Sequence, residues 1–163
     1  TGGKFEFPNV PIGKYRVRMS TISGFNIVDV RQRGASLNDG LVTVGDTSTG
    51  EIEIVISQEG GTIQGIARDR TGGNGGQAII TLLPEPPRNN NILFYRRVIA
   101  DSTGSFTIRG VVQGEYRIFA WDAIEDGAEQ SEVFMQGYQA IGTRLSIRNG
   151  QNAQTQVRII TTR

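Results

Sequence analysis

The chain has 163 residues, of which 17 are Lys or Arg and 16 are Asp or Glu, so its formal net charge is +1. A charge this balanced provides no broad field for nucleic acid or for an anionic membrane surface, and we expect neither as a partner. The absence of Cys and His excludes disulfides, zinc sites built from these ligands, and catalysis by thiol or imidazole groups.

Period-two alternation of apolar and polar residues predicts an all-β chain, with the antiparallel pairing typical of sheets that have one face in water. In chain order, the expected strands are 15–19, 25–31, 51–56, 62–67, 78–83, 92–100, 106–108, 116–121, 144–148 and 157–159. The 22 Gly residues lie largely between these runs, where turns require them. Only Ser131–Tyr138 has a helical pattern, with Ser131 as its expected N-cap.

One pattern occurs twice, at an offset of 101 residues. Gly3–Val10 followed by Gly13–Val17 returns as Gly104–Val111 followed by Gly114–Ile118. A constant offset predicts two copies of one structural unit. We therefore expect residues 1–58 to be the back half of a first module and residues 59–163 to be a complete second module. The first copy lacks counterparts of the expected strands at 62–67, 78–83 and 92–100.

Several motifs carry a resemblance to a known family. They are Gly65–Asp69, the strand at 78–82, Asp101–Ile108 and Gly114–Ile118. Together they resemble the bacterial carboxypeptidase regulatory-like domain, which is a transthyretin-like (Ig-like) β-sandwich of seven strands, close to collagen-adhesin B-type repeats. The resemblance implies tandem sandwiches of which the first is incomplete, and an extracellular or cell-surface location in a bacterium. It implies no defined ligand, since the family is attached to peptidases, adhesins and outer-membrane receptors alike.

The second module should hold a core built by the inward-facing residues of its strands. Those residues are expected to be Ile66, Ile80, Leu82, Phe106, Ile108, Tyr116, Ile118, Val157 and Ile159. Asp101 and Gly104 should form a hairpin turn, in which the glycine adopts a positive φ.

Candidate metal and catalytic groups are few. Five carboxylates lie within eleven residues: Asp122, Glu125, Asp126, Glu129 and Glu132. Oxygen ligands suit Ca²⁺, but this spacing matches no EF-hand loop, and we expect a solvated acidic loop without a metal. The glycine run Gly72–Gly76 lacks the Lys and Ser/Thr of a phosphate-binding loop and is interpreted as a turn. No catalytic residue and no cofactor are predicted, and the chain is not expected to be an enzyme.

Trp121 and Tyr138 are the candidate glycan-contacting residues, because two aromatic rings could form a platform for a sugar. Alternation along the strand 116–121 sets Trp121 on the opposite side from Tyr116, Ile118 and Ala120. The alternative is that Trp121 packs beneath the segment Ser131–Tyr138, which would leave no ring face for a ligand.

These observations predict a non-catalytic structural module that acts as a spacer or an assembly unit at the cell surface. The alternatives are a carbohydrate-binding module and an accessory domain of a larger enzyme or outer-membrane receptor. The incomplete first copy should lack half of its core, because the strands that would cover its inward residues are missing from it. Those inward residues are expected to be Phe5, Phe7, Tyr15, Val17, Ile52, Ile54 and Ile56. Strands from upstream modules of the same protein or from a neighbouring chain would complete it, and in the second case self-association would grow a filament.

Overall fold

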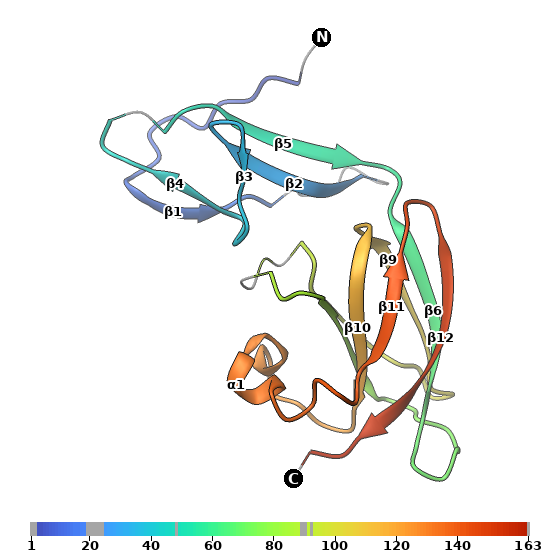
Figure 1. Ribbon diagram of the computed structural model, residues 1–163. Helices are drawn as coiled ribbons and strands as arrows, with labels where there is room; N and C mark the ends of the chain where they lie inside the picture. The colour runs from blue at the N-terminus through green and yellow to red at the C-terminus, as the bar shows by residue number, and fades with distance from the viewer. Residues whose placement is uncertain (1–2, 19–24, 48, 89–90, 92, 163) are drawn as a thin grey trace.

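The computed structural model describes residues 3–18, 25–47, 49–88, 91 and 93–162, and it is all-β apart from two short helical turns. Figure 1 shows two groups of strands, which we call the N-terminal region (residues 3–57) and the C-terminal region (residues 61–162). The three residues 58–60 connect them. None of the described helices is long and apolar enough to cross a membrane.

The described residues of the N-terminal region form five strands in two small sheets. They are β1 (Gly13–Arg16), β2 (Asn26–Gln32), β3 (Ala35–Ser36), β4 (Leu41–Val44) and β5 (Ile52–Ser57). β1 pairs with β4, while β2 lies between β3 and β5, and all of these pairs are antiparallel. Ile27 and Val30 from β2 and Val42 from β4 are the buried residues between the two sheets. This core is small, so it can stabilise the region only weakly.

The C-terminal region forms a near-barrel sandwich of seven strands. Its elements are β6 (Gly61–Arg68), β7 (Ile79–Pro84), β8 (Arg96–Ile99), β9 (Ser105–Val111), β10 (Gly114–Trp121), the 3₁₀ turn η1 (Ala128–Gln130), α1 (Glu132–Met135), β11 (Thr143–Ile147) and β12 (Asn152–Ile160). The strand order is β8-β7-β10-β12-β6-β9, and β11 also pairs with β10. β12 runs parallel to both β6 and β10, which corrects the expectation of purely antiparallel pairing. One layer contains β7, β8, β10 and β11, and the other contains β6 and β9. Because β12 pairs with β10 and with β6, it joins the two layers along one side.

The predicted core of the C-terminal region is largely confirmed. The expected residues that are buried are Ile80, Leu82, Phe106, Ile108, Tyr116, Ile118 and Val157, and the half-buried Ile159 packs against them. The prediction for Ile66 is wrong, since β6 directs Ile63 and Ala67 inward. Residues 63, 65 and 67 share one face of a strand, and Ile66 lies on the other.

The strand pair β1–β4 resembles the pair β10–β11, and both are antiparallel. Gly13 lies opposite Val44 and Gly114 lies opposite Ile147, so at the offset of 101 residues the partner strand is displaced by two residues. The turns that precede them also match. The Tyr15 hydroxyl donates a hydrogen bond to the carbonyl of Pro11 (2.9 Å), and Tyr116, 101 residues later, donates one to Val112 (2.7 Å). The division of the chain into tandem modules stays a prediction that this match supports.

The match ends at the strand before each turn. Ser105–Val111 is β9 and pairs with β6, whereas the corresponding Lys4–Val10 forms no strand. β9 depends on β6 for its partner, and no described strand of the N-terminal region occupies the equivalent position.

Candidate functional site

Trp121 lies at the end of β10 and is fully buried. Its Nε1 donates a hydrogen bond to Oγ1 of Thr81 at 2.8 Å, and the rings of Phe119, Phe134 and Tyr138 lie 5.5, 5.8 and 5.0 Å from the Trp121 ring. Trp121 therefore packs beneath the segment Ser131–Tyr138 and offers no exposed ring face to a sugar. A glycan contact at the half-buried Tyr138 stays a prediction.

The short helix α1 holds this aromatic cluster in place. Ser131 is its N-cap, as expected, and its hydroxyl accepts a hydrogen bond from the backbone N–H of Phe134 at 3.3 Å. Such a cap satisfies one of the N–H groups that a helix leaves unpaired at its start. The helix then directs Phe134 and the buried Met135 onto Trp121.

Arg97 of β8 organises the acidic loop that follows β10. Its guanidinium pairs with the carboxylates of Asp126 and Glu129, each at 3.0 Å, and donates hydrogen bonds to the carbonyl oxygens of Ile124 and Glu125. Glu129 is buried, so the expectation of a solvated loop is wrong for this residue. A buried carboxylate requires a cationic or hydrogen-bonding partner, and Arg97 supplies it.

No group of His, Cys, Asp or Glu in the described part of the chain has the arrangement of a metal site. Asp122, the first carboxylate of the loop, instead receives hydrogen bonds from the backbone N–H groups of Thr162 and Ala123. These bonds, chiefly the one from Thr162, hold the pKa of Asp122 below its usual value. The loop is thus tied to the end of the chain by its own carboxylate.

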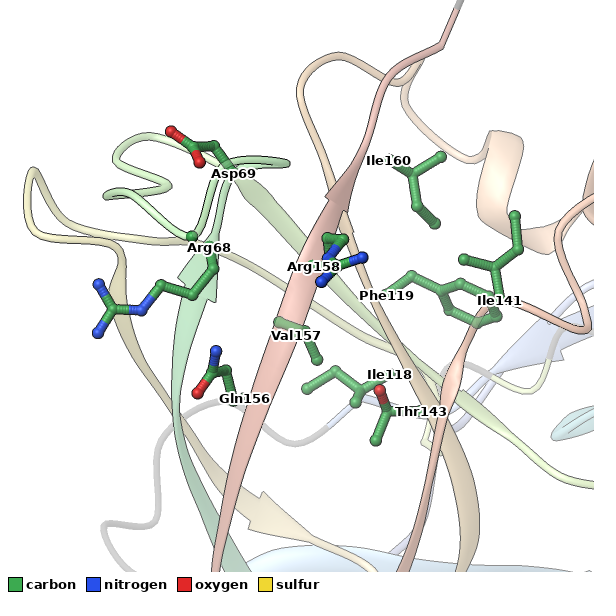
Figure 2. A pocket seen from close by; sticks show the side chains of 11 residues that line it. Arg68, Asp69, Ile118, Phe119, Ile141, Thr143, Gln156, Val157, Arg158 and Ile160 are labelled. Carbon is green, nitrogen blue, oxygen red and sulfur yellow. The ribbon is translucent and has the colours of Figure 1, made fainter.

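A hollow of about 290 Å³ lies where β11 and β12 diverge along β10 (Figure 2). Ile118, Phe119, Val157, Ile160 and Ile141 supply its apolar lining. Polar side chains on its rim are Thr143, Gln156, Arg158, Arg68 and Asp69. The combination of an apolar floor and polar rim groups suits a small polar ligand better than a purely apolar one.

The rim charges are not equivalent. Asp69 accepts hydrogen bonds from Thr71 and Gly73, which close the turn after β6 and lower the pKa of Asp69. Arg68 donates to Asn74 at 3.3 Å in the same turn. Arg158 projects from the exposed face of β12 and forms no ion pair with the described residues, so it is the cation most available to a ligand. No sequence pattern indicated this hollow, because its lining comes from four separate segments.

A smaller hollow lies between α1 and the start of the loop after β7. On its rim, Glu85 receives two hydrogen bonds from Arg117, at 2.9 and 3.0 Å, and a further one from Arg144 at 3.3 Å. The bond from Arg117 is the main reason that the pKa of Glu85 is lowered. The carboxylate of Glu85 and the guanidinium of Arg117 therefore neutralise each other, and we interpret this ion pair as structural.

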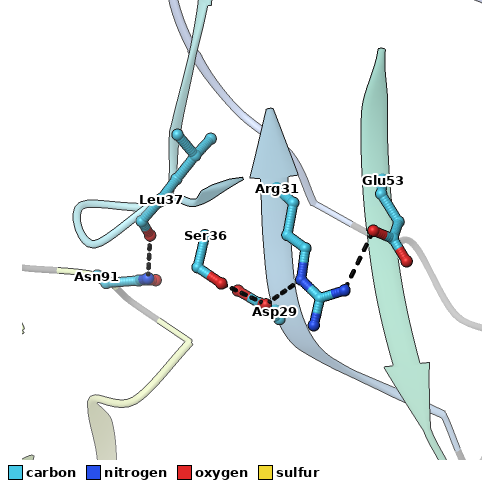
Figure 3. A network of polar contacts seen from close by, with 6 residues as sticks. All are labelled: Asp29, Arg31, Ser36, Leu37, Glu53 and Asn91. Atoms are coloured by element: carbon cyan, nitrogen blue, oxygen red, sulfur yellow. Dashed lines mark hydrogen bonds and ion pairs between the residues drawn. The ribbon is translucent and has the colours of Figure 1, made fainter. Parts of the chain in front are cut away.

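A joint connects the two regions, and we define it as Asn91 and Leu93 with their contacts at Leu37 and Gly40. The buried Asn91 donates from Nδ2 to the carbonyl of Leu37 at 3.4 Å (Figure 3) and accepts at Oδ1 from the N–H of Leu93 at 3.2 Å. Leu93 packs against the core clusters of both regions. Gly40 has φ +65, and a Cβ there would lie 2.7 Å from Oδ1 of Asn91. Only glycine allows this close approach.

A polar network stiffens the sheet beside the joint. Arg31 of β2 pairs with Asp29 on its own strand at 2.8 Å and with Glu53 of β5 at 3.2 Å, and Ser36 of β3 donates to Asp29 at 2.7 Å (Figure 3). The network therefore links all three strands of this sheet. Its members are largely exposed, so it contributes more to geometry than to stability.

Apolar side chains remain uncovered at the start of the chain. Phe5 is 46% exposed and Phe7 is 64% exposed, and their rings meet edge-on with centroids 5.6 Å apart. Ile12, Tyr15 and Ile56 are also exposed. The expected shortage of core is thus seen for Phe5, Phe7, Tyr15 and Ile56, whereas Val17, Ile52 and Ile54 pack against the small N-terminal core.

Comparison with known proteins yields likenesses of structure alone. No protein-family model and no curated protein matches the sequence. A proposed carbohydrate-binding protein from Pseudomonas aeruginosa superposes with a TM-score of 0.42 and 13% identity over 61% of this chain and 88% of that one. A pilus 2b backbone protein of group B streptococcus (TM-score 0.40, 13% identity) and a streptococcal ancillary pilin (0.41, 14%) match 91% and 93% of this chain.

The chain spans about half of each of these two pilins, 53% and 46% of their lengths. At this level of identity and superposition, the likenesses assign neither a family nor an activity to the chain. The resemblance to carboxypeptidase regulatory-like domains accordingly stays a prediction.

Proposed function

We propose that the chain is a non-catalytic structural module of a bacterial extracellular or cell-surface protein, where it acts as a spacer and assembly unit. The joint is the observation that carries this proposal. Leu93 contributes to the cores of both regions, and only residues 58–60 separate β5 from β6. A short connection combined with a shared core holds two regions at a fixed orientation, as a spacer requires.

The chemistry of the described residues agrees with a role without catalysis. The buried carboxylate of Glu129 is paired with Arg97, and Glu85 is paired with Arg117. Asp69 and Asp101 close turns. Each of these carboxylates has a structural partner that accounts for its position, which favours a structural role for all of them.

The proposal is tested by measuring how the two regions tumble in solution. Residual dipolar couplings of the whole chain should fit one alignment tensor for both regions. Leu93→Ala should release them, because it removes the side chain shared by both cores, and the couplings should then need two tensors. Val133→Ala, at an 85% exposed position on α1, is the matched control and should change nothing. Two tensors in the unmodified chain would contradict a spacer.

Carbohydrate binding is the second candidate, and the hollow beside β12 is the feature that favours it. A sugar could lie on the apolar floor while its hydroxyl groups meet Thr143, Gln156 and Arg158. Glycan-array binding that is lost in Arg158→Ala but kept in Arg148→Ala, an exposed arginine elsewhere, would support this function. Service as an accessory domain of a larger enzyme or receptor is compatible with either role.

A further inference from the structure

The uncovered Phe5–Phe7 segment has a buried counterpart in the same molecule. At the offset of 101 residues, Phe5 corresponds to Phe106 and Phe7 to Ile108, and these two are only 5% and 2% exposed. Both lie in the core cluster of the C-terminal region, on a strand that is paired with β6. The C-terminal region therefore displays what kind of partner a segment of this pattern accepts.

The pairing of β9 with β6 has a specific chemistry. Phe106 lies opposite Gly65, and a Cβ built at Gly65 would collide with the Phe106 ring. Ile108 lies opposite Ile63, which is fully buried. A segment with the pattern of β9 thus requires an antiparallel partner strand that places a glycine opposite the first aromatic residue of the segment. The partner also needs an aliphatic residue two positions before that glycine.

We infer that the Phe5–Phe7 segment is a docking site for an extended strand of this β6-like pattern, supplied by another stretch of polypeptide. The inference rests on the proposed role as an assembly unit and names the partner of that role. Docking would convert Phe5–Phe7 into a strand and place the Phe5 ring over the glycine of the partner, as the Phe106 ring lies over Gly65. The partner's alternating side chains would give specificity, and the main-chain hydrogen bonds would give affinity.

The β6 strand of a second copy is a poor source for this partner. β6 is paired on both edges, with β9 on one side and β12 on the other, and it buries Ile63 and Ala67 in its own core. Releasing it would dismantle the complete sandwich. The occupant is therefore a strand outside this sandwich, and pairing between the Phe5–Phe7 segments of two copies is the competing arrangement.

A peptide with the sequence of residues 60–69, which contains β6, tests the inference against the whole chain. Nuclear magnetic resonance titration should show saturable shifts at Phe5 and Phe7 but none at Phe106. The same peptide with Gly65→Val should bind with an affinity at least about tenfold lower, because the added side chain would occupy the space of the Phe5 ring, as a Cβ at Gly65 would meet the Phe106 ring. Equal binding of the two peptides would overturn the inference.

Variants of the chain provide the second arm. Phe5→Ser combined with Phe7→Ser should weaken peptide binding by about tenfold or more. The control Val133→Ser removes an exposed apolar side chain from another surface and should bind as the unmodified chain does. Unchanged binding by the double variant would overturn the inference.

A third outcome separates the two proposals. Concentration-dependent self-association that needs Phe5 and Phe7, without any peptide binding, would overturn the strand partner and leave the assembly role intact. A single alignment tensor with no binding of either kind would likewise leave only the spacer role. Two alignment tensors in the unmodified chain, in contrast, would rule out the spacer role, while peptide binding could still be measured.

Discussion

The N-terminal and C-terminal regions build the same turn and give it different surroundings. The hydroxyl groups of Tyr15 and Tyr116 each donate a hydrogen bond to a carbonyl four residues upstream, and each tyrosine lies in a strand of an antiparallel pair. Yet Tyr15 is 37% exposed and Tyr116 only 1%. Local sequence is sufficient for the turn, whereas burial is supplied by strands that lie far away in the sequence.

This difference also separates the two regions in stability. The C-terminal core contains 16 buried residues and the N-terminal core three, so most apolar burial stabilises the former. The N-terminal region gains part of its support from Leu93, which belongs to the other region. We therefore expect equal substitutions at corresponding positions to have unequal effects.

The largest expected contrast is between Phe106→Ala and Phe5→Ala. Phe106→Ala should lower the free energy of unfolding by about 3–5 kcal/mol, because it leaves a cavity against β6. Phe5→Ala should change it by less than about 0.5 kcal/mol, since this ring is already half exposed. Urea unfolding followed by tryptophan fluorescence measures both. Comparable losses would mean that a partner already covers Phe5 in solution.

Alkaline pH should distinguish the two tyrosines. Burial raises the pKa of Tyr116 to about 12, although Arg96 and Arg88 oppose this. The folded state then holds a proton that the unfolded chain loses near its ordinary value of 10.0. Stability is thus fully present below about pH 10, and about 2–3 kcal/mol should be lost as the pH rises to about 12.

Tyrosine variants assign this alkaline loss. Tyr116→Phe should be less stable at neutral pH, because the hydrogen bond to Val112 is gone, but the steep loss above about pH 10 should also disappear. Tyr15→Phe should keep the loss. If the loss persists in Tyr116→Phe, Tyr116 is not its source.

Breaking an ion pair should also cost more stability in the C-terminal region than in the N-terminal region. Arg97→Met strands the carboxylate of Glu129, whose side chain is 7% exposed, and should cost about 2 kcal/mol, less than for a fully buried pair because Arg97 is itself 25% exposed. Arg31→Met breaks the exposed pair with Glu53 in the N-terminal region and should cost below about 1 kcal/mol. Thermal unfolding in low and high salt measures both, and a salt-sensitive loss at Arg97 would contradict its buried character.

Sequence patterns predicted the fold class and most strands because alternation reports which face of a strand is buried. They predicted β10 and the core position of Phe106 well, since each lies in a clear period-two run. They placed Ile66 on the wrong face of β6, because Ile63, Ile66 and Ala67 fit either phase until the partner strand is known. The short β3 and β4 were missed, since two to four residues carry too little periodicity.

The functional features were harder to predict, for a physical reason. Alternation correctly separated Trp121 from the main core face, but it could not reveal that α1 would cover the ring. The pairing of Arg97 with Glu129 joins residues 32 positions apart, and the hollow beside Arg158 exists only where β11 and β12 diverge. The joint depends on Asn91, which contacts Leu37, 54 positions away in the chain. Contacts between distant segments leave no periodic trace in a sequence.

The smallest expected effect concerns the turn before β9, which is part of the C-terminal region alone. Asp101 accepts hydrogen bonds at one carboxylate oxygen from the side chain and N–H of Thr103 and from the N–H of Ser105, and the Thr103 hydroxyl is the main reason its pKa is lowered. A lowered pKa means that this stabilisation is present above the unfolded value of 3.8 and is lost as the pH falls through the folded value.

Asp101→Asn should therefore be less stable than the unmodified chain at about pH 7, and the difference should shrink as the pH falls through the lowered pKa of Asp101 and the native carboxyl becomes protonated. Thr103→Val should produce a smaller difference with the same dependence on pH, because two backbone donors remain. Urea midpoints at several pH values measure this. A difference that is independent of pH would mean that the turn depends on the shape of the Asp101 side chain rather than on its charge.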